Sequence, residues 1–365
     1  MPTTSRLLSS TPSAGRNTWC SPPGAAASTG WVYVGAARRL DQAGVQPSYI
    51  LGTSMGALIG LIMSRTPTQN WDEHIALAHG LDRRKLFAPI GIKRKHGMSG
   101  LLTLWLHDSL GHLFRQEDGT PTRINQLPVA YEAVVAGVRR AAFDKLPRRF
   151  RATAASMRSR VAPLARYSQR SLAPAIATRM WQVAAFFDPR VVRPIVFGAD
   201  SLTAECDALD AAGFSAAIPG VLHYDIDDAN TRMDQLLTEL ADRESISALV
   251  DGGVSSNVPA EQAWRRVQAG KIGTRNAMVL AWDCFHPQWD PRHLWLQPIT
   301  QAVALQHVRN APFADHVIRF SPTLSPIDLV PEPDRFDTSL GWGAAAVEPA
   351  LPLLAKLLEP VGWDE

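Results

Sequence analysis

Residues 49–60 read Tyr-Ile-Leu-Gly-Thr-Ser-Met-Gly-Ala-Leu-Ile-Gly, with a Gly-x-Ser-x-Gly motif at their centre made of Gly52, Thr53, Ser54, Met55 and Gly56. The apolar residues before the motif predict a short buried strand, and the apolar run after it, as far as Met63, predicts a helix. A serine between such a strand and helix lies on a sharp turn, with its hydroxyl exposed at the helix N-terminus. The stretch therefore predicts an α/β fold with a nucleophilic serine at Ser54.

The glycines of the motif have a steric role. The turn is tight, so a side chain at Gly52 or Gly56 is expected to collide with the neighbouring strand and helix. Gly-x-Ser-x-Gly also arises by chance in many chains, so the strand–serine–helix context gives the motif its weight.

A second motif lies 197 residues after Ser54. Residues 246–259 read Ile-Ser-Ala-Leu-Val-Asp-Gly-Gly-Val-Ser-Ser-Asn-Val-Pro, so Asp251 follows a short apolar strand and enters a turn at Gly252 and Gly253. Taken alone, Asp-Gly is a common signature of a turn that ends a strand. The pair of motifs is more informative than either motif by itself.

Together the motifs resemble those of the patatin-like phospholipase family, which carries Gly-x-Ser-x-Gly near its start and Asp-Gly-Gly or Asp-Gly-Ala much later. Three further stretches fit in order: a first helix over 30–40, the segment 214–221 that resembles Ala-Ser-x-Ala-Ile-Pro, and Asn-Val-Pro at 257–259. The resemblance covers roughly residues 24–64 and 125–348.

The resemblance implies a patatin-like three-layer α/β/α fold around a central, mostly parallel sheet. It also implies a lipid acyl hydrolase without cofactor or metal, which cleaves carboxylic esters of phospholipids or related lipids through a Ser54–Asp251 dyad and an acyl-enzyme. Ser54 would be the nucleophile, Asp251 the proton acceptor, and the Met55 N–H one oxyanion donor. In a closed pocket, dehydration is expected to raise the pKa of Asp251.

The chain departs from the family at the glycine-rich loop that forms the oxyanion hole. The expected oxyanion positions hold Ala26, Ala27, Ser28, Thr29 and Gly30, where the family has Gly-Gly-Gly-x-Arg-Gly. Alanine keeps its N–H but resists positive φ by about 1 kcal/mol, and losing one oxyanion donor costs ~10²–10³ in rate. A weak or inactive lipid-binding protein and an acyltransferase on the same dyad therefore stay as alternatives.

The composition of residues 16–23 argues against the family's buried first strand, because it includes two prolines and few β-branched residues. Three explanations stay open: a disordered tail, loss of that strand, or an incorrect reading frame before about residue 28. We expect an atypical or disordered tail over 1–29, a patatin-like domain over 30–348 with a basic helical insertion at about 145–190, and a C-terminal helix end and tail over 349–365.

The 365 residues include 46% hydrophobic and 19% charged side chains, which is typical of a globular protein. No apolar stretch is long enough to span a membrane, and the start of the chain lacks a secretory h-region. Three widely spaced cysteines indicate reduced thiols and no metal cluster. We expect a cytoplasmic protein, and the net charge of +3 gives no reason to expect nucleic acid as a partner.

The chain has two basic regions, and the longer one is a candidate for contact with an anionic membrane surface. Between Arg139 and Arg179 there are eleven Lys or Arg and one acidic residue, and apolar residues recur there at helical spacing. This pattern fits either ordinary surface helices or a basic amphipathic element on lipid. The basic runs at 83–85 and 93–96, with the apolar stretch 101–113, fit either a surface loop with a core helix or a mobile lid.

A Ser–Asp–His hydrolase is a further alternative, with His286, His293, His307 and His316 following Asp251 in the right order. The serine motif lies very early in the chain for that class. Apolar runs predict strands near 48–52, 129–137, 193–198, 246–250, 277–283 and 315–320, and a last helix near 341–358.

Overall fold

The computed structural model describes residues 18–21, 27–89, 95–146, 183–285, 297–325 and 329–359. The strands are β1 (Thr18–Ser21), β2 (Tyr49–Thr53), β3 (Phe87–Pro89), β4 (Leu102–Leu104), β5 (Ala130–Arg139), β6 (Val192–Phe197), β7 (Leu222–His223), β8 (Ile246–Asp251), β9 (Ala277–Asp283) and β10 (His316–Arg319). The longer helices are α1 (Val32–Gln42), α2 (Met55–Met63), α3 (Trp71–His79), α10 (Ala208–Ser215), α11 (Thr231–Glu244), α12 (Ala260–Gln268), α13 (Gln297–Asn310), α14 (Pro333–Val347) and α15 (Leu351–Leu358).

Short helical turns connect these elements. They are η1 (Ala27–Trp31), α4 (Arg83–Leu86), α5 (Leu106–Leu110), η2 (Gly111–Phe114), η3 (Ile124–Gln126), α6 (Arg140–Phe143), η5 (Ala184–Phe187), α9 (Ser201–Ala204), η6 (Gly252–Val254), η8 (Ala311–Phe313) and η9 (Glu348–Ala350).

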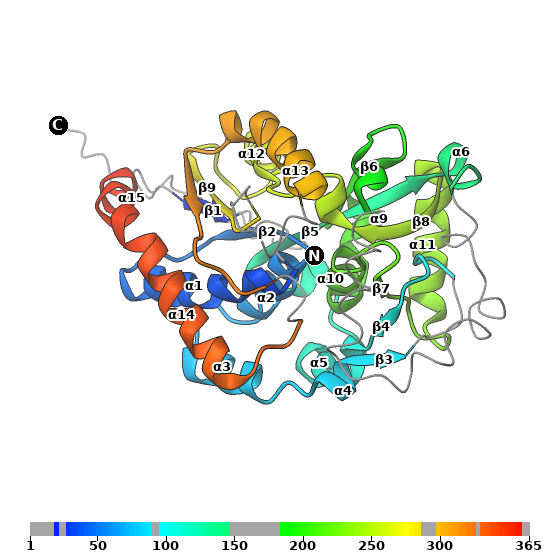
Figure 1. Ribbon diagram of the computed structural model, residues 1–365, viewed down its shortest axis with the longest axis horizontal. Helices are drawn as coiled ribbons and strands as arrows, with labels where there is room; N and C mark the ends of the chain where they lie inside the picture. Colours follow the sequence, from blue (N-terminus) through cyan, green and yellow to red (C-terminus); the bar gives the residue numbers. More distant parts are fainter. Residues whose placement is uncertain are drawn as a thin grey trace, which may run out of the picture.

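The main sheet runs in the order β10-β9-β1-β2-β5-β6, and β8 pairs with β5 (Figure 1). The pairs β10–β9, β9–β1, β1–β2 and β2–β5 are parallel, whereas β6 and β8 run antiparallel to β5. All six predicted strands are present, with ends that differ from the prediction by at most two residues. A small second sheet joins β3, β4 and β7.

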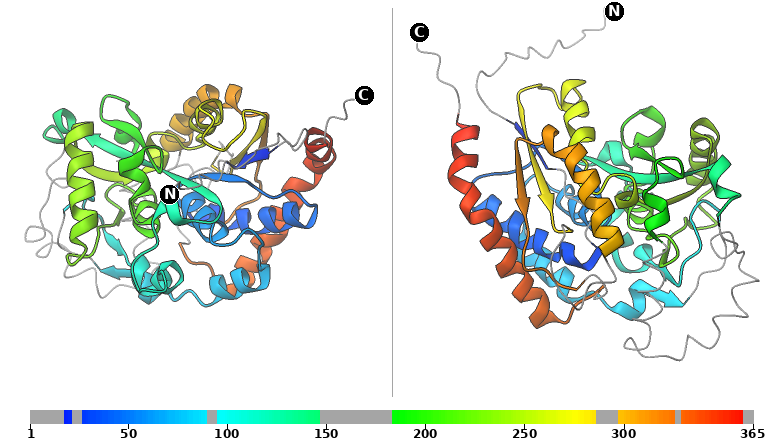
Figure 2. Two further views of the ribbon diagram at one scale, coloured as in Figure 1. Left: turned by 180° about the vertical axis from the view of Figure 1, so that it is seen from behind. Right: turned by 45° about the horizontal axis from the view of Figure 1, so that its top comes forward.

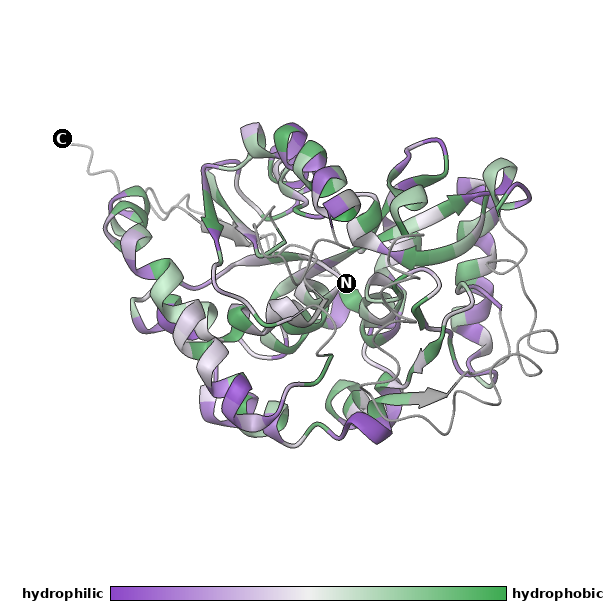
Figure 3. Ribbon diagram, in the orientation of Figure 1, coloured by the Kyte–Doolittle hydropathy of each residue, from purple (hydrophilic) through white to green (hydrophobic). Residues whose placement is uncertain are grey.

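Helices cover both faces of the main sheet, as Figure 2 shows from two sides. In β2, Ile50 lies in the core shared with α1 and α2, while Tyr49 and Leu51 lie in a separate core with Ala263 and Val267 of α12. Figure 3 shows apolar residues concentrated in the central strands and polar residues on the outer helices. This α/β/α arrangement confirms the predicted fold class. A strand that is covered by helices on both sides must be apolar on both faces.

The composition-based argument against a first strand is wrong for residues 18–21. These residues form β1, which pairs in parallel with β2 on one side and β9 on the other. The strand is short, and the two prolines at positions 22 and 23 follow its last residue, so neither removes a hydrogen bond within it. Residues 18–21 of the predicted tail therefore belong to the main sheet.

The last helix begins earlier than predicted. Pro333 opens α14 at a position where proline is favoured, and the helix stops at Val347 before α15 begins. Gly341 is not a helix start: it lies inside α14 with open space beside it. Gly343 has a different role, because any Cβ there would overlap the backbone of α1 at Val32.

The predicted basic insertion lies mostly at 147–182, outside the described residues. The predicted lid region contains α4, β3, β4 and α5, while 90–94 also lies outside them. Within the part of the chain that the structure describes, no helix is long and apolar enough to cross a bilayer.

Candidate active site

The serine motif forms a strand–turn–helix as predicted. β2 ends at Thr53, which is fully buried, and α2 begins at Met55, so Ser54 alone makes the turn. Its φ of 54° lies in a region that residues other than glycine rarely adopt, which costs on the order of 1–3 kcal/mol. Gly52 makes this geometry possible, because a Cβ there would lie 2.6 Å from the carbonyl oxygen of Gly56.

The aspartate motif forms the second turn. β8 ends at Asp251, and η6 begins at Gly252. The Gly253 N–H donates to Asp251 Oδ1 at 2.7 Å, so the carboxylate caps its own turn. Gly252 is sterically required, because a Cβ there would overlap the carbonyl of Val134.

Sheet register brings the two turns together. β6 occupies one edge of β5, so β2 and β8 must share the other edge, with β2 parallel and β8 antiparallel to β5. Thr53 is paired with Val134, and Asp251 is paired with the next residue, Val135. The carboxyl ends of β2 and β8 therefore meet end to end, and Ser54 Oγ donates to Asp251 Oδ2 at 2.6 Å.

Both side chains are shielded from water, with Ser54 3% and Asp251 5% exposed. Burial raises the pKa of Asp251 to about 7, despite the opposing effect of the hydrogen bonds from Ser54 and Gly253. A carboxylate that titrates near neutral pH can accept a proton from an adjacent hydroxyl much better than an ordinary aspartate.

The predicted oxyanion segment is helical where it is described. Ala26 lies outside the described residues, and Ala27, Ser28, Thr29 and Gly30 belong to η1, which packs against α2. Thr29 stands where the family has arginine; it is buried and its hydroxyl lies 3.1 Å from Cys284 Sγ. Met55 and Gly56 open α2, where N–H groups have no acceptor within the helix.

In the described part of the chain, none of the candidate histidines joins Ser54 and Asp251. His286 and His293 lie outside them, His307 Nε2 lies 3.1 Å from an Arg319 nitrogen, and His316 lies on β10. Among the residues described, no histidine is hydrogen-bonded to Ser54 or Asp251.

One contact was missed by the sequence analysis. The Ser54 N–H donates to Ser215 Oγ at 2.8 Å, and Ser215 belongs to the segment 214–221 that was noted only for its resemblance. The signal in the sequence was the single polar residue, Ser215, at an otherwise apolar helix end. In the Asn-Val-Pro segment, the Asn257 N–H donates to Gln306 Oε1 at 2.9 Å, and its buried side-chain oxygen has no hydrogen-bond partner among the described residues.

An apolar cavity of about 100 Å³ begins beside the nucleophile motif. Met55, the residue after Ser54, lines it together with residues of α2, α3 and α5. The lining is almost entirely aliphatic and aromatic, and it includes Leu58, Ile62, Trp71, Leu106 and Leu110. Such a space suits a hydrocarbon chain. Within the described residues, no group of three or more potential ligands is placed to hold a metal ion.

Fold and site define an α/β protein with a serine and a carboxylate at the meeting ends of two strands. A family model described as patatin-like phospholipase matches residues 24–264, about two thirds of the chain, so the chain belongs to the patatin-like phospholipase family. Membership supports a hydrolase of acyl lipids in general terms. No curated protein sequence matches the chain significantly.

Proposed function

We propose that this protein hydrolyses carboxylic esters of phospholipids or related acyl lipids, with Ser54 as the nucleophile and Asp251 as the proton acceptor. The observation that carries the proposal is the 2.6 Å hydrogen bond from Ser54 Oγ to Asp251 Oδ2 in a water-poor site. Direct contact lets the proton leave the hydroxyl as it attacks, so no intervening histidine is required.

In the first half-reaction, Ser54 Oγ bonds to the ester carbonyl carbon while its proton passes to Asp251 Oδ2. The tetrahedral oxyanion then collapses, the ester C–O bond breaks, and the leaving alcohol takes the proton from Asp251. In the second half-reaction, water gives a proton to Asp251 and attacks the acyl-enzyme. Collapse releases the fatty acid, and Ser54 recovers its proton.

The oxyanion needs donors aimed at it. We assign one to the Met55 N–H, which opens α2 directly after the nucleophile. The remaining donors would come from the η1 segment that replaces the glycine-rich loop, where Ala27 to Gly30 retain their N–H groups.

The apolar cavity lined by Met55 supports an acyl lipid as the substrate. A fatty acyl chain placed there buries its methylenes, each contributing about 0.8 kcal/mol. An acyl lipid held in this way would keep its polar head group outside the cavity.

The altered oxyanion segment also supports two other functions on the same site. A weak or inactive lipid-binding protein would keep the cavity without turnover. An acyltransferase would pass the acyl group to an acceptor other than water.

The test is labelling by a fluorophosphonate probe in wild type, Ser54→Ala and Asp251→Asn. Ser64→Ala is the matched control, because Ser64 is another buried serine, whose hydroxyl donates only to the Gly60 carbonyl at 2.7 Å. Labelling that disappears in Ser54→Ala, weakens in Asp251→Asn and persists in Ser64→Ala supports the hydrolase. A folded wild type that does not label contradicts it and favours the lipid-binding protein. Fatty acid release measured against acyl transfer then separates the two enzymes.

A further inference from the structure

One short segment at the end of α10 contacts the main chain of both proposed dyad residues. The Ser54 N–H donates to Ser215 Oγ at 2.8 Å. Two residues further on, the carbonyl of Ala217 accepts the Asp251 N–H at 2.8 Å. The two turns thus share a support that belongs to neither of their own strands.

The Ser215 hydroxyl links the Ser54 turn to the sheet. It accepts from the Ser54 N–H and donates to the Val134 carbonyl at 2.6 Å, and Val134 is the β5 residue paired with Thr53. Ser215 is fully buried, so water cannot readily replace a lost bond. The Ser54 N–H is thereby occupied, and it is not available as an oxyanion donor.

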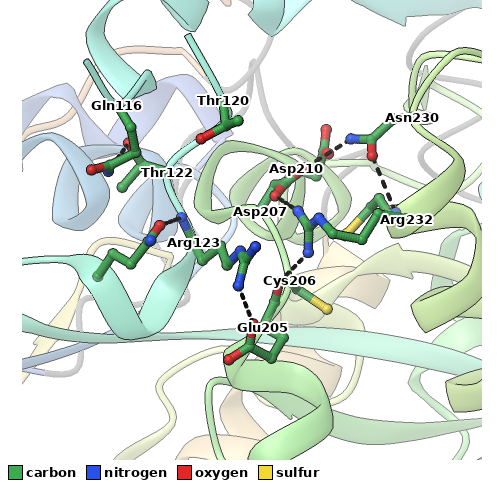
Figure 4. Close-up of polar contacts among 12 residues, drawn as sticks. Gln116, Thr120, Thr122, Arg123, Glu205, Cys206, Asp207, Asp210, Asn230 and Arg232 are labelled. Atoms are coloured by element: carbon green, nitrogen blue, oxygen red, sulfur yellow. Dashed lines mark hydrogen bonds and ion pairs between the residues drawn. The ribbon is translucent and has the colours of Figure 1, made fainter. Parts of the chain in front are cut away.

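The other end of α10 is fixed by a buried polar cluster (Figure 4). Asp207 precedes the first residue of the helix, and its carboxylate accepts hydrogen bonds from the side chains of Arg232 and Asn230 rather than from the helix backbone. One turn on, Asp210 Oδ1 accepts from the Tyr224 hydroxyl at 2.5 Å and lies 2.7 Å from His107 Nε2. Every residue of α10 is buried, so packing along the whole helix holds its C-terminal end in place.

We propose that Ser215 is a positioning residue, which holds Ser54 in its positive-φ conformation so that Oγ stays within reach of Asp251. The catalytic consequence of this contact rests on the proposed function, whereas the contact itself does not depend on it. Ala217 gives Asp251 the corresponding main-chain support. Because Ala217 acts through its carbonyl, Ser215 is the member of the segment that a side-chain substitution can test.

The first measurement is the rate of Ser54 labelling by a fluorophosphonate in Ser215→Ala. We expect a fall of about 10²-fold, since a displacement of the order of 1 Å at a reacting atom has that effect. The pH midpoint of labelling should also rise, because the Ser54 hydrogen bond lowers the pKa of Asp251 and would be weakened. Ser339→Ala is the matched control: Ser339 is equally buried, and its hydroxyl donates to the Phe336 carbonyl at 2.6 Å.

The second measurement is amide hydrogen exchange at Ser54, which does not depend on activity. In wild type the Ser54 amide should be protected, and in Ser215→Ala it should lose that protection while Ser339→Ala keeps it. If wild type fails to label, the proposed function fails, yet exchange still decides the positioning role.

Unchanged labelling and unchanged Ser54 exchange in a folded Ser215→Ala variant would overturn the proposal. Should that variant not fold, wild type alone is decisive. A Ser54 amide that exchanges as fast as an exposed loop amide excludes the contact with Ser215, whereas strong protection supports it.

Discussion

The Ser54 turn and the Asp251 turn end two strands that lie end to end along one edge of β5, yet they are stabilised differently. Asp251 has an ordinary negative φ of −46°, and its own Oδ1 caps the turn. Ser54 has φ 54°, makes no side-chain cap to its helix, and donates its N–H to a residue 161 positions away. The Asp251 turn therefore has a cap of its own in addition to its contact with Ala217, whereas the Ser54 turn has no side-chain cap and depends on the contact with Ser215.

This difference has a physical reason. The Ser54 hydroxyl is directed at Asp251 and makes no cap to α2, so another group supports the turn. The strain at Ser54 persists only because Gly52, Ser215 and the start of α2 fix the surrounding backbone.

The largest effects are expected where each turn requires glycine. Gly52→Ala places a Cβ against the backbone of α2, and Gly252→Ala places one against the Val134 carbonyl. Because neither neighbour is a flexible side chain, each variant should lose about 3 kcal/mol or more of unfolding free energy. Urea denaturation followed by circular dichroism measures the loss.

Gly341→Ala is the matched control for both glycine variants. It lies inside α14 with nothing near its Cβ position, so alanine should be neutral or stabilise the protein by up to about 1 kcal/mol. If Gly252→Ala were as stable as this control, the close approach to Val134 would be refuted.

Replacing Asp251, the proposed proton acceptor, comes next. Asp251→Asn keeps an oxygen for the Gly253 N–H but cannot take the Ser54 proton, so the labelling rate should fall by about 10²–10⁴-fold with the fold intact.

In wild type the labelling rate should rise with pH, with a midpoint near the Asp251 pKa of about 7, and then reach a plateau. Labelling rates measured from pH 5 to 9 check this; a rate that is already at its plateau throughout this range, as expected for an ordinary aspartate with a pKa near 4, would contradict the effect of burial on Asp251.

The same carboxyl makes stability depend on pH. Its folded pKa of about 7 lies above the usual value near 4, so the folded state binds an extra proton between these values and loses stability as pH rises through 7. The loss is at most about 4 kcal/mol. Thermal unfolding of wild type and Asp251→Asn at pH 5 and 8 should show a smaller decline in the variant, and parallel declines would exclude the effect.

A smaller effect is expected at the anchor of α10. Burial disfavours a charged His107, but the hydrogen bond and charge of Asp210 exceed this and raise the pKa of His107. The stability that charged His107 contributes through Asp210 is present below the ordinary histidine pKa and is lost as pH rises through the raised pKa. His107→Gln should therefore cost about 0.5–1 kcal/mol at pH 5.5, and less at pH 8.5, after allowance for partial exposure. An equal loss at both pH values would rule out the ionic component.

Much of the fold was predictable because its signals are local. The apolar runs of six strands, the helix after Ser54 and the two glycine turns each lie within about ten residues of sequence. β1 was not predictable in this way, since four residues of mixed composition become a strand only when β2 and β9 supply hydrogen-bonding partners on both sides. The start of α14 was misjudged because Gly341 was taken as a boundary, whereas Pro333 sets it.

The sequence by itself determined the residue types and local turns of the site: Ser54 between a strand and a helix, and Asp251 before two glycines. Only the tertiary structure decided that these turns meet, because their distance depends on the register of β2 and β8 along β5. It also decided the pKa of Asp251, which follows from burial, and the role of Ser215, whose hydroxyl bridges two distant segments. Register, burial and long-range hydrogen bonds are properties of the assembled core, and no local stretch of sequence contains them.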